Sequence, residues 1–306
     1  MRILVTGASG LLGLNLALEA AKDNLVFGTV NKLAIKTDAF NVVQTDFLVE
    51  GALERLLEQT RPDWVIHCAA LANLDDCEKR PALAEQLNTL LPAKLAGYVA
   101  RGGARLVHVS TDAVFDGQRG DYREQDTPNP LSVYARTKLE GERLVAAANP
   151  EASIARVNLF GWSPTGSRSL AEFFYYNLRQ GKPVMGFTDV YFCPLLVNDL
   201  AAIFQAMLQK GLSGLYHTVS RECLSKYDFG VRLAHKFGLD SGLIQPTSVE
   251  QAGLDARRSP RLTLRSDRLA QALGEPPPDF NSGLERLYQL QQQGYPQFLQ
   301  SLRRQT

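Results

Sequence analysis

Thr6-Gly7-Ala8-Ser9-Gly10-Leu11-Leu12-Gly13 is the stretch that decides the fold of this 306-residue chain. A short apolar run, Ile3–Thr6, precedes it, and a stretch of helical period, Leu12–Lys22, follows it at once. Glycine suits such a turn because the chain must reverse tightly, approach a bound pyrophosphate and pack its helix closely on the strand. The helix N-terminus offers N–H groups and a positive dipole end to phosphates. The motif predicts a dinucleotide-binding loop, with a glycine turn that binds nothing as the alternative.

Short apolar runs alternate with helical stretches from this loop to about residue 160, which is typical of a parallel sheet with crossover helices. The expected strands are Ile3–Thr6, Leu25–Val30, Asn41–Thr45, Trp64–Cys68, Arg105–Ser110 and Ile154–Asn158. The expected helices are Leu12–Lys22, Glu50–Gln59, Ala82–Ala100 and Val133–Ala148. We therefore predict an α/β fold with a doubly wound parallel sheet of the Rossmann type.

After Phe160 this rhythm breaks, and it returns only briefly. We expect a helix over Leu170–Arg179, a second helix that Asn198 caps and that ends at Gln209, and a strand over Gly214–Val219. We interpret residues 1–162 and 197–220 as an NAD(P)-binding domain. Residues 163–196 and 221–306 would then form a smaller, mixed substrate-binding domain.

The composition is that of a globular protein, with 45% hydrophobic and 21% charged residues. A net charge of +1 gives no indication of a nucleic-acid or membrane partner. The N-terminus lacks the apolar stretch of a signal peptide, and no segment has the roughly 18 apolar residues of a membrane span, so we expect a cytoplasmic protein.

The cysteine pattern gives no indication of disulfides or of a metal site. The four cysteines are widely spaced and include no C-x-x-C pair: Cys68, Cys77, Cys193 and Cys223. This spacing favours a reducing compartment without disulfides and without structural zinc. We expect Cys68 and Cys193 to be buried, inert thiols.

The residue type at the tip of the second strand determines whether NAD or NADP is preferred. A carboxylate there binds the ribose 2′-hydroxyl of NAD, whereas a basic residue accommodates the 2′-phosphate of NADP. This strand runs into Asn31-Lys32, so we predict that NADP(H) is preferred and that NAD(H) is possible. Asp46, followed by Phe47 after the third strand, is a candidate acceptor for the adenine amino group. The alternative for Lys32 is a solvated surface charge.

Tyr134 and Lys138 stand four residues apart in a predicted helix, which Ser132 is expected to cap, so both point to one face. We expect the ammonium to lower the pKa of the phenol and to make it a general acid for a carbonyl oxygen. A strand that ends in Ser110-Thr111 precedes them and would add a hydroxyl. A surface Tyr–Lys pair is the alternative.

At this point the sequence resembles the extended short-chain dehydrogenase/reductase superfamily along its length, most closely the dTDP-4-dehydrorhamnose reductases. The matching features are TGASGLLG, Cys68-Ala69-Ala70, Asn88, STDAVFDG at 110–117 and YARTK followed by Leu139-Glu140-Gly141-Glu142. The resemblance implies that Thr111, Tyr134 and Lys138 form the catalytic set. It also implies that the cofactor contacts the glycine loop and the strand ends, through Gly7, Ser9, Gly10, Leu11, Leu12, Gly13, Cys68, Ala69, Ala70 and Ser110.

Ala113 is a departure from that resemblance. The reductases usually have Tyr at this position beside the sugar, which leaves the substrate open. The related 4,6-dehydratases have Asp-Glu after the Thr as acid and base, so Ala113 argues against dehydration. A second departure is Arg258-Ser259 in place of Arg-Pro.

The resemblance implies reduction of a 4-keto nucleotide sugar, with hydride delivered to C4 and Tyr134 as the proton donor. We expect substrate contacts from Asp112, Asn158, Trp162 and Arg258, although each of the first three has a capping or packing role as its alternative. A nucleotide-sugar epimerase and a non-catalytic, NADP-binding regulatory subunit are the alternative functions. The helices on the glycine-free face of the sheet are candidates for a homodimer contact.

Overall fold

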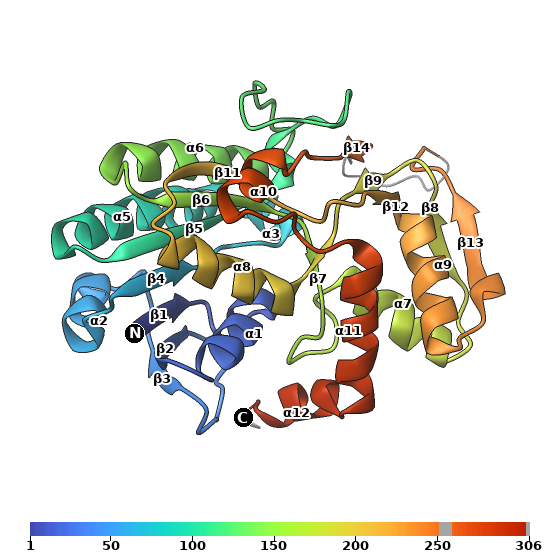
Figure 1. Cartoon of the computed structure of the whole chain (residues 1–306), viewed down its shortest axis with the longest axis horizontal. Coiled ribbons are helices and arrows are strands. Elements are labelled where there is room, and N and C mark those ends of the chain that lie inside the picture. The colour runs from blue at the N-terminus through green and yellow to red at the C-terminus, as the bar shows by residue number, and fades with distance from the viewer. Residues whose placement is uncertain (251–258, 304–306) are drawn as a thin grey trace.

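The computed structural model describes residues 1–250 and 259–303, and its centre is a seven-stranded parallel sheet in the order β11-β6-β5-β4-β1-β2-β3 (Figure 1). The strands of this sheet are β1 (Arg2–Thr6), β2 (Leu25–Val30), β3 (Asn41–Gln44), β4 (Trp64–His67), β5 (Arg105–Thr111), β6 (Ser153–Val157) and β11 (Gly214–Thr218). The order runs outward from β1 in both directions, which confirms the doubly wound Rossmann-type prediction. The switch point between β1 and β4 is where such sheets bind ligands.

Helices cover both faces of the sheet because the strands are apolar on both sides. On β1, Ile3 and Val5 belong to the core beneath α1 (Leu11–Ala20) and α8 (Val197–Gln209). Leu4 faces the opposite way, into the core beneath helices α2 (Ala52–Thr60), α5 (Leu91–Gly102) and α6 (Val133–Ala148). All three side chains are fully buried, so the sheet is the middle layer of a three-layer structure.

The rest of the described chain forms small sheets and helices beyond the carboxyl end of the main sheet. The pairs are β7 (Leu159–Phe160) with β10 (Leu195–Leu196), β8 (Val184–Phe187) with β13 (Ile244–Thr247), and β9 (Tyr191–Phe192) with both β12 (Leu224–Ser225) and β14 (Arg261–Leu262). The helices are α7 (Leu170–Arg179), α9 (Lys226–Phe237), α10 (Asp267–Leu273), α11 (Phe280–Gln292) and α12 (Tyr295–Ser301). Whether the domain bounds expected from the sequence divide the molecule functionally stays a prediction.

The predicted helix over Ala82–Ala100 is wrong as a single helix. It consists of α4 (Pro81–Glu85), a π-helical turn (Gln86–Leu90) and α5, and the short α3 (Leu74–Lys79) precedes it. Pro92 has no N–H to donate to the carbonyl of Asn88, which widens the helix there. That carbonyl lies against α6, where a Cβ on Gly141 would stand 2.2 Å from it. The break therefore lets α6 pack tightly.

Asn198 does not cap α8, contrary to the sequence-based expectation. Leu196 holds the N-cap position, and Asn198 is the second residue of the helix. Its buried amide donates instead to Glu19 Oε1 of α1, at 2.9 Å. A polar residue at a helix start thus links two helices on one face of the sheet.

The expectation of unpaired cysteines is also wrong, because Cys193 and Cys223 form a disulfide. The two cysteines are 30 residues apart in sequence. The strands β9 and β12 pair antiparallel, with Leu224 opposite Phe192, and this register places Cys223 opposite Cys193. Only the pairing of two short strands brings the sulfur atoms together, so sequence spacing gave no indication of it.

Among the described residues no helix is long and apolar enough to cross a membrane.

The disulfide predicts the thiol content. In denaturant without reductant, a thiol reagent should detect two groups, Cys68 and Cys77, and after reduction it should detect four. Cys223→Ser should show three thiols in both conditions and should lose about 3 to 4 kcal/mol of unfolding free energy, because a closed loop of this size restricts the unfolded chain. Four reactive thiols in the unreduced wild-type chain would contradict the assignment.

Candidate active site

The glycine loop between β1 and α1 is packed closely against other backbone at three glycines. Gly7 has φ of 73°, and a Cβ there would stand 3.0 Å from the backbone of Ala69. A Cβ on Gly13 would stand 2.3 Å from the carbonyl oxygen of Gly7. Gly10 N–H donates to the same oxygen at 3.0 Å. Side chains at Gly7 and Gly13 would push α1 away from this backbone, so the loop, called the glycine cradle below, has the close packing that the pyrophosphate prediction requires.

The N-terminus of α1 opens into this cradle. Its N-cap, Gly10, provides no side-chain hydrogen bond, and no acidic residue stands in the first turn. The first N–H groups of a helix have no acceptor within the helix, and its dipole favours negative charge there. Ser9 is half-buried beside the turn, and Leu11 and Leu12 begin the helix with buried side chains. The arrangement suits a phosphate group.

Thr6 joins the glycine loop to the end of β4. Its hydroxyl accepts hydrogen bonds from the N–H groups of Cys68 and Ala69, each at 3.1 Å. It also lies 2.8 Å from His67 Nδ1, and burial lowers the pKa of His67 to about 3. His67 is therefore neutral and acts as a buried hydrogen-bond partner of the Thr6 hydroxyl. Beyond it, Ala70 is exposed at the strand end.

Cys68 lies beside the loop, and its side chain is half-buried. Burial raises the pKa of the thiol to about 12, although the Lys138 ammonium opposes this shift. The reactive thiolate is therefore scarce at neutral pH, although the residue is half-buried and not buried as expected.

Tyr134 and Lys138 lie on one face of α6, next to the end of β5. Ser132 caps this helix as predicted, because its hydroxyl accepts from Ala135 N–H at 3.2 Å. The Tyr134 phenol lies close enough to the side chain of Thr111, the last residue of β5, for Thr111 to favour the phenolate. Lys138 is 3% exposed, and its ammonium donates to Val109 O at 2.6 Å. The structure thus brings together the three residues of the predicted catalytic set.

The expected lowering of the Tyr134 pKa by Lys138 is wrong for this arrangement. Desolvation raises the pKa of Tyr134 to about 12, the charge of Asp112 adds to the shift, and the hydrogen bond with Thr111 opposes it. Desolvation also lowers the pKa of Lys138 to about 8. The ammonium is held by a strand carbonyl, so burial outweighs its attraction for a phenolate. The phenol accordingly keeps its proton at neutral pH.

Asp112 and Asn158 meet at the carboxyl ends of β5 and β6. The Asn158 amide donates to Asp112 Oδ2 at 2.5 Å, and Thr111 Oγ1 donates to Asp112 Oδ1 at 3.1 Å. Asp112 is 5% exposed, and burial raises its pKa to about 6 against these hydrogen bonds and the charge of Lys226. The sequence did not indicate Lys226, which comes from the start of α9, because its position depends on how α9 packs.

Beneath the catalytic set lies a buried ion pair that sequence reasoning did not use. Glu142 of α6 accepts from Arg156 of β6 at 2.7 and 3.0 Å, and from the Ser110 hydroxyl at 2.5 Å. Ser110, predicted to contact the cofactor, therefore directs its hydroxyl into this network. Glu142 follows Lys138 by one helical turn and favours its charged form. That four-residue spacing was the signal available in the sequence.

The residues predicted for the adenosine end lie at the tips of β2 and β3. Asn31 and Lys32 are exposed directly after β2. Asp46 is exposed after β3, and its Oδ1 accepts from Leu48 N–H at 3.0 Å, which fixes the turn that carries the half-buried Phe47. The parallel register of β2 and β3 places both tips at the same edge as the glycine loop. Their roles toward a nucleotide stay predictions.

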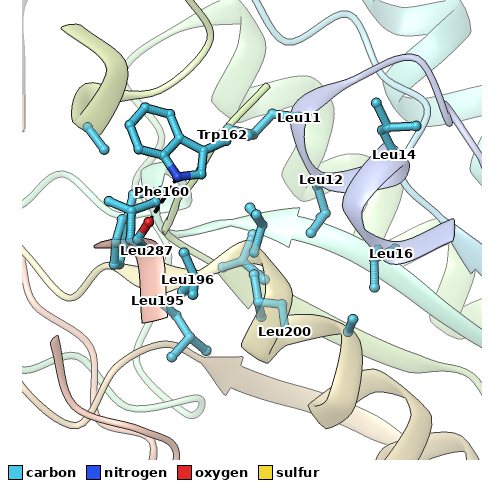
Figure 2. Close-up of a cluster of buried hydrophobic side chains, with 14 of the residues drawn as sticks. Leu11, Leu12, Leu14, Leu16, Phe160, Trp162, Leu195, Leu196, Leu200 and Leu287 are labelled. Atoms are coloured by element: carbon cyan, nitrogen blue, oxygen red, sulfur yellow. Dashed lines mark hydrogen bonds between the residues drawn. The ribbon is translucent and has the colours of Figure 1, made fainter. Parts of the chain in front are cut away.

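Trp162 was predicted to contact the substrate, with core packing as the alternative. The structure shows core packing. Its side chain is fully buried, and its indole N–H donates to Leu287 O of α11 at 3.1 Å. Figure 2 shows the ring beside Leu11 of α1 and Phe160. Arg258 lies outside the described residues.

The pKa of Asp112 predicts a pH-dependent effect on stability. Its folded pKa of about 6 lies above the unfolded value of 3.8, so stability falls as the pH rises between these values and is constant above them. Asp112→Asn should therefore be more stable than wild type by up to about 3 kcal/mol near pH 7.5, and by little near pH 4. Urea unfolding at both pH values checks this.

The matched control is Asp38→Asn, at an exposed loop position, which should leave the difference near zero at both pH values. An Asp112→Asn variant whose stability difference is the same at both pH values would contradict the shift.

Comparison with known proteins shows which family the chain resembles. The family model described as the RmlD substrate binding domain matches residues 1–293. A dTDP-4-dehydrorhamnose reductase of Mycobacterium tuberculosis is 34% identical over 281 residues, covering 89% of this chain and 87% of that protein. The methionine adenosyltransferase 2 subunit beta of Danio rerio is 31% identical over 278 residues, covering 88% and 84%. The crystal structure of dTDP-4-dehydrorhamnose reductase from Bacillus anthracis in complex with NADP is 25% identical, with a TM-score of 0.83 over 94% of this chain and 98% of that one.

The parallel sheet, the glycine cradle and the Thr–Tyr–Lys arrangement together define an NAD(P)-dependent oxidoreductase of the extended short-chain dehydrogenase/reductase type. Within that class, the chain belongs to the RmlD substrate binding domain family, whose model spans almost its entire length.

Proposed function

We propose that this protein reduces a 4-keto nucleotide sugar with NADPH, as a relative of the dTDP-4-dehydrorhamnose reductases. The observation that carries the proposal is the placement of the protonated Tyr134 beside the side chain of Thr111, with the buried Lys138 one turn further along α6. This arrangement lies at the edge of the sheet where the glycine loop also opens. Proton donation to a carbonyl oxygen needs such a positioned acid.

The residues that would hold the cofactor follow from the cradle. The N–H groups at the start of α1 would bind the pyrophosphate, Lys32 the 2′-phosphate and Asp46 the adenine amino group. Lys138 would hold the nicotinamide ribose. When bound, NADPH supplies a hydride equivalent to C4 of the sugar. The preference for NADP(H) is supported by Lys32 and by the NADP complex of the Bacillus anthracis relative.

Tyr134 would act as the proton donor. Its phenol keeps its proton at neutral pH because desolvation raises its pKa, and the carbonyl oxygen gains negative charge as it is reduced. Thr111 would hold the same oxygen through its hydroxyl. The Lys138 ammonium would stabilise the phenolate that remains after proton transfer, since a positive charge nearby favours the anionic form.

Asp112 and Asn158 would bind sugar hydroxyl groups, because both lie at the strand ends beside Thr111. In this proposal the segments 163–196 and 221–306 form the substrate side, and Arg258 binds the substrate diphosphate. Ala113 leaves the sugar less enclosed than Tyr would. Trp162 is not included because its ring is in the core.

A non-catalytic, NADP-binding subunit is the second candidate function. The observation that favours it is the 31% identity to a methionine adenosyltransferase 2 subunit beta. The intact Thr111, Tyr134 and Lys138 favour catalysis instead. NADPH oxidation measured over a panel of 4-keto nucleotide sugars separates the two, because a subunit of this kind oxidises no NADPH with any of them.

Tyr134→Phe should abolish reduction while cofactor binding persists. Loss of the proton donor should lower kcat by about 10² to 10⁴-fold. The NADP⁺ dissociation constant should stay within about twofold, because the phenyl ring fills the same space. Tyr98→Phe, on α5 and bonded to Glu54, is the matched control and should keep full activity. Unchanged turnover of Tyr134→Phe would refute the assignment.

Lys32→Ala should weaken NADP⁺ binding by about 10 to 100-fold and leave NAD⁺ binding nearly unchanged, because only NADP⁺ has the 2′-phosphate. Calorimetric titration of both nucleotides measures the two effects. Lys182→Ala, at an exposed position after α7, is the control and should change neither. Equal losses for NADP⁺ and NAD⁺ would contradict a 2′-phosphate contact.

A further inference from the structure

The C-terminal end of the described chain lies against the loop that follows β2. Lys36 N–H donates to Leu302 O at 2.7 Å, and Ile35 forms an antiparallel bridge with Arg303. Figure 1 shows α12 at the same end of the molecule as the β2 and β3 tips. Residues about 270 positions apart therefore share backbone hydrogen bonding, as a strand pair does.

Apolar packing reinforces this contact. Ile35 is 5% exposed, Leu302 is 7% exposed and Leu299 is fully buried, and all three belong to one core cluster. The loop residues just before them, Asn31 and Lys32, are exposed. The loop thus has a fixed apolar end and a polar end that faces solvent. The fixed end limits where Lys32 can lie.

A second contact links α12 to the glycine loop through α1. The Tyr295 hydroxyl donates to Asn15 Oδ1 at 2.8 Å. Asn15 is fully buried in α1, and its amide donates to Leu11 O at 2.7 Å and to Trp162 O at 2.9 Å. Leu11 is the first residue of α1, whose N–H groups face the cradle. One side chain of α12 therefore fixes the first turn of the proposed pyrophosphate-binding helix.

We propose that α12 and the residues up to Arg303 are a positioning element for the cofactor. Tyr295 holds the first turn of α1, which meets the pyrophosphate common to both nucleotides. Leu302 and Arg303 hold the loop after β2, which presents Lys32 to the 2′-phosphate. This inference rests on the proposed function for the identity of the ligand. The physical basis is preorganisation: a loop that is already fixed loses less conformational entropy when it binds.

The two contacts predict different binding defects. A chain that ends at Ser301 loses the loop contact. Its dissociation constant for NADP⁺ should rise at least tenfold, and its dissociation constant for NAD⁺ should rise less than threefold. Tyr295→Phe loses the α1 contact, so both constants should rise by a similar factor of about three to ten. A chain that ends at Arg303 is the matched control and should bind both nucleotides as the full chain does.

Calorimetric titration of NADP⁺ and NAD⁺ into each purified chain gives these constants without an activity assay. A purely structural role for α12 would lower the melting temperature but leave both dissociation constants unchanged. If the chain ending at Ser301 does not fold, Tyr295→Phe and full-length Ile35→Ala provide the same two tests. Ile35→Ala should then lower the NADP⁺ to NAD⁺ preference.

Constants within twofold of wild type in the folded variants would overturn this proposal alone. A full-length chain that binds neither nucleotide would overturn both this proposal and the proposed function. A full-length chain that binds both but reduces no keto sugar would overturn only the proposed activity.

Discussion

The close contact between Gly7 and Gly13 is the constraint on which the rest of the site depends. Because neither residue has a Cβ, the first turn of α1 packs directly onto the end of β1, and its N–H groups face the switch point of the sheet. The Thr6 hydroxyl then fixes this turn to β4 through two backbone N–H groups. A larger side chain at either glycine would separate α1 from the strand and misplace every group that follows.

The catalytic side is held together by a buried charge network in addition to close packing of α6. Glu142 and Arg156 pair between α6 and β6, and Ser110 of β5 joins them, so the three elements that carry or flank Thr111, Tyr134 and Lys138 share one buried network. Such a pair costs desolvation and adds little net stability compared with apolar packing, but losing one partner is severe. We infer that its benefit here is position: it fixes the distance between a strand end and a helix.

Burial at the site disfavours the charged forms of three side chains, and the stability of the rest of the fold must offset this free-energy cost. It raises the pKa of Asp112 and of Tyr134 and lowers that of Lys138, so each charged form is disfavoured where the chemistry is expected. Perturbed groups of this kind gather at functional sites. The relatives of this chain include a dTDP-4-dehydrorhamnose reductase and a methionine adenosyltransferase 2 subunit beta, so the fold alone does not determine which function a chain has.

The sequence alone determined what depends on local chemistry. The glycine loop, the helix Val133–Ala148 with its Ser132 cap, and the apolar strands are encoded within a few residues, and the structure has each of them. Tertiary structure decided what depends on distant pairing. Burial, not the charge of Lys138, sets the Tyr134 pKa; strand pairing joins Cys193 to Cys223; and α11 closes over Trp162. These follow from contacts between residues far apart in sequence, which no local pattern specifies.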